Sequence, residues 1–124
     1  MAKTIMIVDD SVTMLMSLRN SLEIAGFQVL SAADGALALA QLGAGPKPDL
    51  IITDINMPNM GGIELIGKVR ALTGFRFIPI LALTTESQQA RRDEAKALGA
   101  SGWLVKPVAS ADLVRIIKQV LPGA

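Results

Sequence analysis

The sequence predicts an α/β fold in which five parallel strands form a doubly wound sheet with helices on both faces. Short β-branched segments alternate with helix-forming segments along the chain, which is the pattern of repeated β-α units. The segment Leu50-Ile51-Ile52-Thr53 is apolar without polar alternation, as in strands that are buried on both faces of a parallel sheet. We expect one domain over residues 1–124, because no linker or low-complexity stretch divides the chain.

Each expected strand is a short apolar or β-branched run, and the helices between them are bounded by capping and turn residues. The strands are expected at residues 4–8, 27–31, 50–53, 77–83 and 103–105. The first helix is expected to follow Ser11 and to end at Gly26, the next three to span residues 36–42, 62–72 and 87–98, and the last to begin near Ser110. Ser11 and Asp34 have side-chain oxygens suited to helix N-caps, and Gly26 is typical of a helix C-terminus.

The last and the fourth helix differ in their apolar patterns. The last helix has the most regular stripe in the chain, formed by Leu113, Ile116, Ile117, Val120 and Leu121. In the fourth helix only Ala90, Ala97 and Leu98 share a face, and Glu94 lies between them. We therefore expect the fourth helix to be lightly anchored and able to shift.

The composition excludes several classes of function. Net charge is only +1 and the basic residues are scattered, so no nucleic-acid partner is expected. The chain contains no histidine and no cysteine, which excludes the usual zinc sites and histidine-assisted nucleophiles. The longest early apolar run, residues 5–8, is too short for a signal or membrane segment. We expect a soluble cytoplasmic protein without membrane insertion.

Chemically capable side chains stand where the predicted strands end. Asp9 and Asp10 follow the first strand, Asp54 the third, Thr84 the fourth and Lys106 the fifth. Parallel sheets bind ligands at the carboxyl ends of their strands, so these side chains are expected to meet at one edge. Clustered carboxylates repel one another unless a cation joins them, and oxygen ligands alone favour Mg²⁺. A cation, an ammonium and a hydroxyl around a carboxylate nucleophile would suit phosphoryl transfer to Asp54.

The same residues also have structural interpretations. An aspartate at a strand end often forms a turn, and the Asp9-Asp10 pair could favour the positive end of the following helix. Thr84 could serve as a β-former and Lys106-Pro107 as an ordinary turn. An aromatic residue such as Trp103 on a short strand more often packs than signals.

Together, these motifs resemble the receiver domains of two-component response regulators over the whole chain. They are Val8-Asp9-Asp10, the run from Asp54 to Gly62, Thr84, and Lys106-Pro107. Among receivers the chain is most similar to stand-alone chemotaxis regulators of the CheY type, because of Asn56-Met57-Pro58-Asn59-Met60, Glu86 and Gly99-Ala100-Ser101-Gly102-Trp103. The resemblance implies a CheY-like, flavodoxin-like (βα)5 sheet with strand order 2-1-3-4-5.

The resemblance also implies roles for individual residues. Asp54 would be the phosphoacceptor, and Asp10, Asp54 and the backbone carbonyl of Asn56 would hold Mg²⁺, with Asp9 acting mainly through a water. Lys106 would pair with the phosphoryl group. Asn56 and Glu86 would flank the path of the water that later hydrolyses the acyl phosphate.

Switching in this family couples the phosphorylated site to a distant surface. By resemblance, the Thr84 hydroxyl would move toward the phosphoryl group and the Trp103 ring would turn into the space it leaves. The partner surface would then include Gln88, Arg92, Lys96, Trp103 and Lys118. The chain departs from the commonest family pattern at Gly61, Thr85, Trp103 and Val108.

The expected function is that of a phosphorylation-activated signalling protein, which catalyses only its own phosphorylation and slow dephosphorylation. The implied partners are a sensor histidine kinase, a target such as the flagellar motor switch protein that controls flagellar rotation, and a phosphatase. The alternative within the family is a phosphate sink or a relay in another two-component pathway. An FMN carrier, an aspartate-based phosphatase with Asn56 in place of its second acid, and an inert scaffold are the alternatives outside this function.

Overall fold

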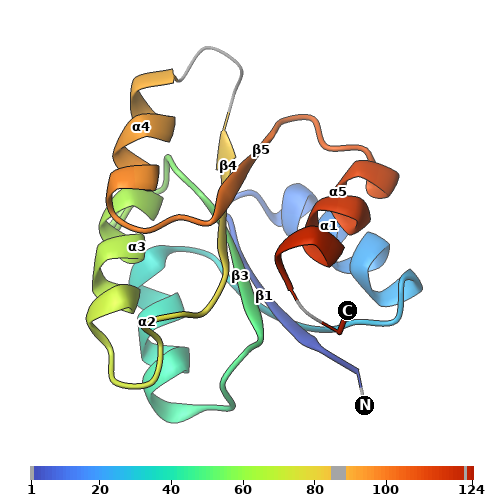
Figure 1. The fold of residues 1–124 in the computed structure, drawn as a ribbon, viewed down its shortest axis with the longest axis horizontal. Helices are drawn as coiled ribbons and strands as arrows, with labels where there is room; N and C mark the ends of the chain where they lie inside the picture. The colour runs from blue at the N-terminus through green and yellow to red at the C-terminus, as the bar shows by residue number, and fades with distance from the viewer. Residues whose placement is uncertain (1, 85–88, 122) are drawn as a thin grey trace.

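The structure is a computed structural model that describes residues 2–84, 89–121 and 123–124. Strands and helices alternate along these residues (Figure 1). Their bounds are β1 Thr4–Val8, α1 Val12–Ile24, β2 Gln28–Ala32, α2 Gly35–Ala44, β3 Leu50–Asp54, α3 Gly62–Ala71, β4 Ile80–Thr84, α4 Gln89–Ala97, β5 Gly102–Val105 and α5 Ser110–Val120. All pairings are parallel and the strand order is β2-β1-β3-β4-β5. The predicted fold class and strand order are confirmed.

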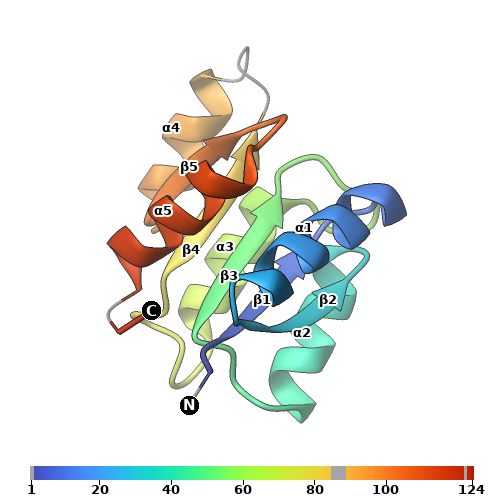
Figure 2. The same cartoon turned by 90° about the vertical axis from the view of Figure 1, so that its right-hand side faces the viewer.

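Helices cover both faces of the sheet because strand side chains alternate between the two faces (Figures 1 and 2). On β1, Met6 and Val8 pack with buried residues of α2, α3 and α4. Ile5 and Ile7 of the same strand pack with buried residues of α1 and α5 on the opposite face. The central strands β3 and β4 are buried along their whole lengths, which explains why their sequences lack polar alternation.

The two predicted N-caps fold as expected. The Ser11 hydroxyl accepts a hydrogen bond from the Met14 N–H at 3.2 Å, and an Asp34 carboxylate oxygen accepts one from the Leu37 N–H at 2.9 Å. Each cap satisfies an N–H group that the first helical turn leaves without an intrahelical partner. Among the described residues, no helix is both long and apolar enough to span a membrane.

Strand β4 is shorter than predicted, and the expectation of a strand over residues 77–83 was wrong at its beginning. Phe77 lies in a turn with 86% of its surface exposed, and the strand begins at Ile80. Proline has no N–H to donate to a strand neighbour, so Pro79 marks the boundary. Its carbonyl still accepts a hydrogen bond from the Ile51 N–H at 3.0 Å.

The inward residue of α4 also differs from the prediction. Ala95 is buried, whereas Ala90, Ala97 and Leu98 are exposed. Alanine periodicity alone could not distinguish these faces, because a methyl group adds little apolar area whichever way it points. Ala95 is the one buried residue among those of α4 whose side chains the structure describes, so the helix makes little contact with the core.

Candidate functional site

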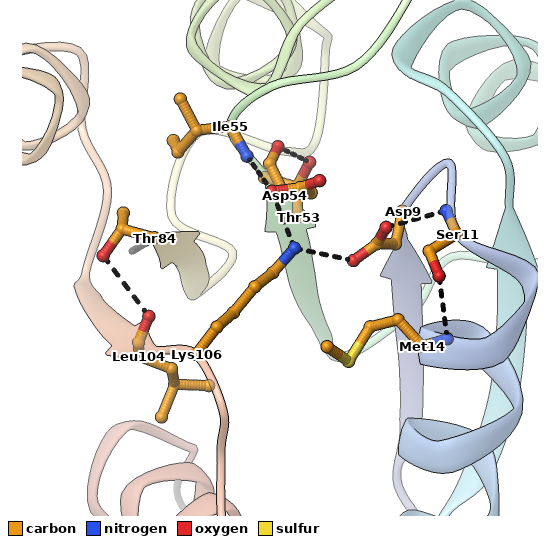
Figure 3. Close-up of polar contacts among 9 residues, drawn as sticks. All are labelled: Asp9, Ser11, Met14, Thr53, Asp54, Ile55, Thr84, Leu104 and Lys106. Carbon is orange, nitrogen blue, oxygen red and sulfur yellow. Dashed lines mark hydrogen bonds and ion pairs between the residues drawn. The ribbon is translucent and has the colours of Figure 1, made fainter. Parts of the chain in front are cut away.

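The carboxyl ends of three strands bring two acids and one amine together (Figure 3). Asp9 follows β1, Asp54 ends β3 and Lys106 follows β5. The Lys106 ammonium lies 3.2 Å from Asp9 Oδ2 and 3.2 Å from Asp54 Oδ1. The side chain reaches across the sheet edge and bridges residues that are far apart in sequence. The predicted convergence at one edge is therefore present for these three residues.

Asp10 completes a compact group of carboxylates. One oxygen from each of Asp9, Asp10 and Asp54 lies within 4.8 Å of the other two. Asp9 and Asp54 are buried, whereas Asp10 is exposed. An oxygen-only group open to solvent on one side fits Mg²⁺, which keeps several waters when it binds to carboxylates. These residues could therefore hold the predicted ion.

Burial and neighbouring charge act against each other at Asp54. Burial raises the pKa of the Asp54 carboxyl, the nearby Asp9 carboxylate raises this pKa further, and the Lys106 ammonium opposes both. The net shift of the Asp54 pKa is upward. For Lys106, burial lowers the pKa, but attraction to Asp54 and Asp9 outweighs burial and the pKa is raised. The lysine thus remains a cation, and the carboxylates favour an added positive charge.

The two oxygens of the Asp54 carboxylate have different surroundings. Oδ1 accepts the Ile55 N–H at 2.8 Å and also contacts the Lys106 ammonium. The described residues donate no hydrogen bond to Oδ2 that would compete with a reacting group. On Asp9, by contrast, Oδ1 accepts the Ser11 N–H at 2.9 Å and Oδ2 contacts Lys106 at 3.2 Å. Among the described contacts, Asp54 therefore has one oxygen left for chemistry, whereas Asp9 has both engaged.

The loop that follows Asp54 returns directly onto the end of its strand. The Gly62 N–H donates to the Ile55 carbonyl at 2.9 Å. A Cβ atom on Gly62 would lie only 2.0 Å from the Asp54 carbonyl oxygen. The sequence placed Gly62 only at the end of the Asp54 motif and at the start of a helix. The close approach to the Asp54 backbone is the stronger reason for a glycine.

The same loop is also tied to the start of α2. Asn59, which has a φ of 65°, donates from Nδ2 to Asp34 Oδ2 at 2.9 Å. The Gly35 N–H donates to the Met60 carbonyl at 3.2 Å. The sequence predicted Asp34 only as a helix cap and missed this second role. The one available signal was Asn59, because asparagine tolerates positive φ in turns.

The predicted switch involves Thr84, which ends β4, and Trp103, which lies on β5. Thr84 is buried, and its hydroxyl donates to the Leu104 carbonyl at 3.5 Å, which is a long hydrogen bond directed toward β5 (Figure 3). Trp103 lies on β5 and is 37% exposed. The Arg92 guanidinium of α4 lies over the Trp103 ring, 5.7 Å from its centroid. In this structure the threonine hydroxyl points away from the carboxylates and the tryptophan faces outward.

The predicted partner surface combines neighbouring elements, since α4, β5 and α5 lie side by side in both views (Figures 1 and 2). Lys96 on α4 and Lys118 on α5 are exposed, and Arg92 is partly buried beside Trp103. Gln88 lies outside the described residues. Glu86, which was expected near the path of the hydrolytic water, also lies outside them. The same is true of Thr85, which departs from the commonest family pattern.

A hollow of about 470 Å³ opens beside the acids. The described residues that line it are Asp10, Ile55, Asn56, Met57, Pro58, Gly61 and Arg91. Asn56 therefore lies at the same opening as Asp10, and its role as a magnesium ligand stays a prediction. Arg91 was not predicted, because the sequence gives no sign of where α4 begins relative to the sheet edge.

Comparisons with known proteins agree with this geometry. A family model described as the response regulator receiver domain matches residues 5–118. The chain is 38% identical over 118 residues to the chemotaxis protein CheY1 of Helicobacter pylori strain J99, covering 94% of this chain and 95% of that protein. The structure of the chemotaxis response regulator CheY4 of Vibrio cholerae has a TM-score of 0.92 at 40% identity and covers 98% of this chain and 100% of that chain.

A third relative bears on the acidic cluster. The receiver domain of the sensor histidine kinase PA1611 from Pseudomonas aeruginosa has a TM-score of 0.88 at 28% identity and covers 97% of this chain and 98% of that chain. In that structure a magnesium ion is coordinated in the active-site cleft. With a family match over residues 5–118 and relatives that share its length and fold, this chain belongs to the response regulator receiver domain family.

Proposed function

We propose that this protein is a single-domain response regulator that accepts a phosphoryl group on Asp54 from a sensor histidine kinase. The modified protein then changes the affinity of its α4-β5-α5 surface for a target. Such a protein acts in signalling and is not a conventional enzyme. The observation that carries the proposal is the Lys106 ammonium, 3.2 Å from both Asp9 and Asp54, beside an Asp54 oxygen without a donor from the described residues.

The transfer needs one bond to form and one to break. Asp54 Oδ2 attacks phosphorus, the bond between phosphorus and the donor breaks, and the electron pair leaves with the donor. Negative charge on the equatorial oxygens is stabilised by the Lys106 ammonium. A magnesium ion held by Asp10, Asp54 and the Asn56 carbonyl, with Asp9 acting mainly through a water, would neutralise phosphoryl charge at the same place.

The switch would pass from this site to β5. The phosphoryl group offers the Thr84 hydroxyl a stronger, charged acceptor than the Leu104 carbonyl that it reaches at 3.5 Å. Movement of Thr84 would then open space near β5 for Trp103. Because α4 has little core contact, the surface formed by α4, β5 and α5 can change between two arrangements at low cost. The proposed contact residues on this surface are Gln88, Arg92, Lys96, Trp103 and Lys118.

Labelling with a small phosphodonor tests the chemistry directly. The unsubstituted protein with Mg²⁺ and acetyl phosphate should gain one phosphoryl group by intact mass, and the label should be lost in alkali, as expected for an acyl phosphate. Asp54→Asn should take no label, while circular dichroism shows that it remains folded. Equal labelling of the two proteins would refute Asp54 as the acceptor.

The pathway is a separate part of the proposal. Chemotaxis is favoured because the chemotaxis proteins CheY1 and CheY4 are 38% and 40% identical to this chain over 94% and 98% of it, and the target would then be the flagellar motor switch protein in the cytoplasm. The alternative is a phosphate sink or a relay in another pathway. Phosphorylated protein should bind purified motor switch protein more tightly than Asp54→Asn does. Binding that is equal in both forms, together with fast transfer from the chemotaxis kinase, would favour the sink.

A further inference from the structure

We propose that Arg91 binds the leaving group of small acyl-phosphate donors at the mouth of the acidic site. This inference rests on the proposed function, since it concerns the same transfer to Asp54. It assigns a donor-binding role to a residue of α4, outside the group of strand-end residues formed by Asp9, Asp10, Asp54 and Lys106.

Position is the first observation. Arg91 lines the hollow of about 470 Å³ that also contains Asp10 and Asn56. Among the described residues of this lining it is the one cation, and it stands across the opening from the Asp10 carboxylate and Asn56. A guanidinium is always charged and matches planar anions with paired donors, so it can attract an anionic group that enters this opening.

Charge balance is the second observation. The carboxylates of Asp9, Asp10 and Asp54 together with the Lys106 ammonium leave a net charge of −2 at the strand ends. A bound divalent cation brings this charge to about zero, so a dianionic donor gains little attraction from the strand ends. Lys106 is already held by two carboxylates. Arg91 supplies positive charge at the opening, where its exposed partner is Glu94 of the same helix and not one of those carboxylates.

The direction of transfer is the third observation. In an in-line displacement the leaving group lies on the side of phosphorus opposite the attacking oxygen. Asp54 is 7% exposed and its strand is buried behind it, so the leaving group is directed to the open side of the site. With acetyl phosphate, the Asp54 Oδ2–P bond forms, the bond between phosphorus and the acetyl oxygen breaks, and that electron pair leaves on acetate. A guanidinium matches a carboxylate with two parallel hydrogen bonds.

The structure also shows how Arg91 is held. Its guanidinium lies 3.5 Å from Glu94, one turn along α4, and both side chains are about half exposed. An exposed pair of this kind contributes little to stability, so Arg91 can exchange Glu94 for an anionic ligand at low cost. Replacing Arg91 should therefore alter donor binding without unfolding the protein.

The test compares Arg91→Ala and Arg91→Lys with Arg115→Ala, each with saturating Mg²⁺. Arg115 is a matched control, because it forms a similar exposed pair with Asp112 at 3.4 Å on α5. Initial rates are measured against acetyl phosphate concentration. Arg91→Ala should raise the KM for acetyl phosphate by at least about tenfold, because the loss of even one of the two charge-assisted hydrogen bonds has an effect of this size. Arg91→Lys should recover part of this loss, and Arg115→Ala should match the unsubstituted protein.

A second donor separates leaving-group binding from a general effect on the site. Phosphoramidate releases neutral ammonia, so Arg91→Ala should raise its KM much less than that of acetyl phosphate. Unchanged KM for acetyl phosphate, or an equal rise for both donors, would overturn the inference while leaving the proposed function intact. Absence of labelling in the unsubstituted protein with either donor would instead refute the proposed function, and this inference with it.

Discussion

Replacing Gly62 with alanine should destabilise the protein, whereas the same replacement at Gly67 in the same helix should stabilise it. Both glycines lie in α3, and neither has a positive φ. Alanine is therefore allowed by the backbone at both positions, and it is the better helix former by about 1 kcal/mol. The main difference between the two variants is what the added Cβ meets.

The structure gives the size of that difference. At Gly62 the Cβ would lie 2.0 Å from the Asp54 carbonyl oxygen and 2.9 Å from the Asp54 carbonyl carbon. Favourable contacts between heavy atoms lie near 3.5 Å, so the backbone would have to move by more than about 1 Å. Overpacking of this kind costs roughly 3 kcal/mol or more, which leaves a net loss of about 2 kcal/mol or more after the gain in helix propensity. At Gly67 the nearest atom is a Leu98 methyl at 3.9 Å, and a gain of about 0.5 to 1 kcal/mol is expected.

Urea unfolding followed by far-ultraviolet circular dichroism and by the fluorescence of Trp103 measures both values. A loss of this size should lower the thermal midpoint by about 10 °C in a domain of this length, and the gain at Gly67 should raise it by a few degrees. Displacement of Asp54 should also weaken Mg²⁺ binding to Gly62→Ala but leave it unchanged in Gly67→Ala. Equal or higher stability of Gly62→Ala relative to the unsubstituted protein would show that the loop relaxes freely, contrary to the reasoning here.

Three further outcomes follow from the charges. In EDTA at neutral pH, Asp54→Asn should unfold at a higher temperature than the unsubstituted protein. The Asp54 pKa is raised, so this acid contributes stability at low pH and the contribution is lost as pH rises through the folded-state pKa. A lower thermal midpoint for Asp54→Asn would contradict this. Mg²⁺ affinity, measured by calorimetry, should rise as pH rises through the pKa of Asp54, and a flat profile would count against the raised value. Asp34→Ala should lower the thermal midpoint at neutral pH, and its difference from the unsubstituted protein should shrink in acid. Hydrogen bonds from the Leu37 N–H and Asn59 lower the Asp34 pKa below its ordinary 3.8, so the stability that the carboxylate contributes is lost as pH falls through the folded-state pKa. A difference in midpoint that grows in acid would oppose the assignment.

The sequence could predict the sheet and the strand-end residues because both depend on short-range patterns. An uninterrupted apolar run indicates a buried parallel strand, and the carboxyl ends of parallel strands lie at one edge of a sheet. Asp9, Asp54 and Lys106 could therefore be grouped without coordinates. The strand order needed the resemblance to a family, since alternation alone does not fix which strand lies at the centre.

What could not be predicted depends on contacts between segments. The tie from Asn59 to Asp34 joins residues that are 25 positions apart, and no local pattern marks such a pair. The beginning of β4 was misplaced because Phe77 has high strand propensity, whereas its exposure is decided by the turn before Pro79. Arg91 was missed because a charged residue on a polar helix gives no sign of which hollow it borders.

The unequal surroundings of the Asp54 oxygens have a consequence for reversibility. If a phosphoryl group is attached to Oδ2, Oδ1 becomes the carbonyl oxygen of a mixed anhydride and can keep the Ile55 N–H that it accepts in the unmodified protein. The Asp54 side chain then needs no new rotamer when it gains or loses the phosphoryl group. Phosphorylation and dephosphorylation would then use the same Asp54 rotamer, and the structural response would come from the surrounding elements.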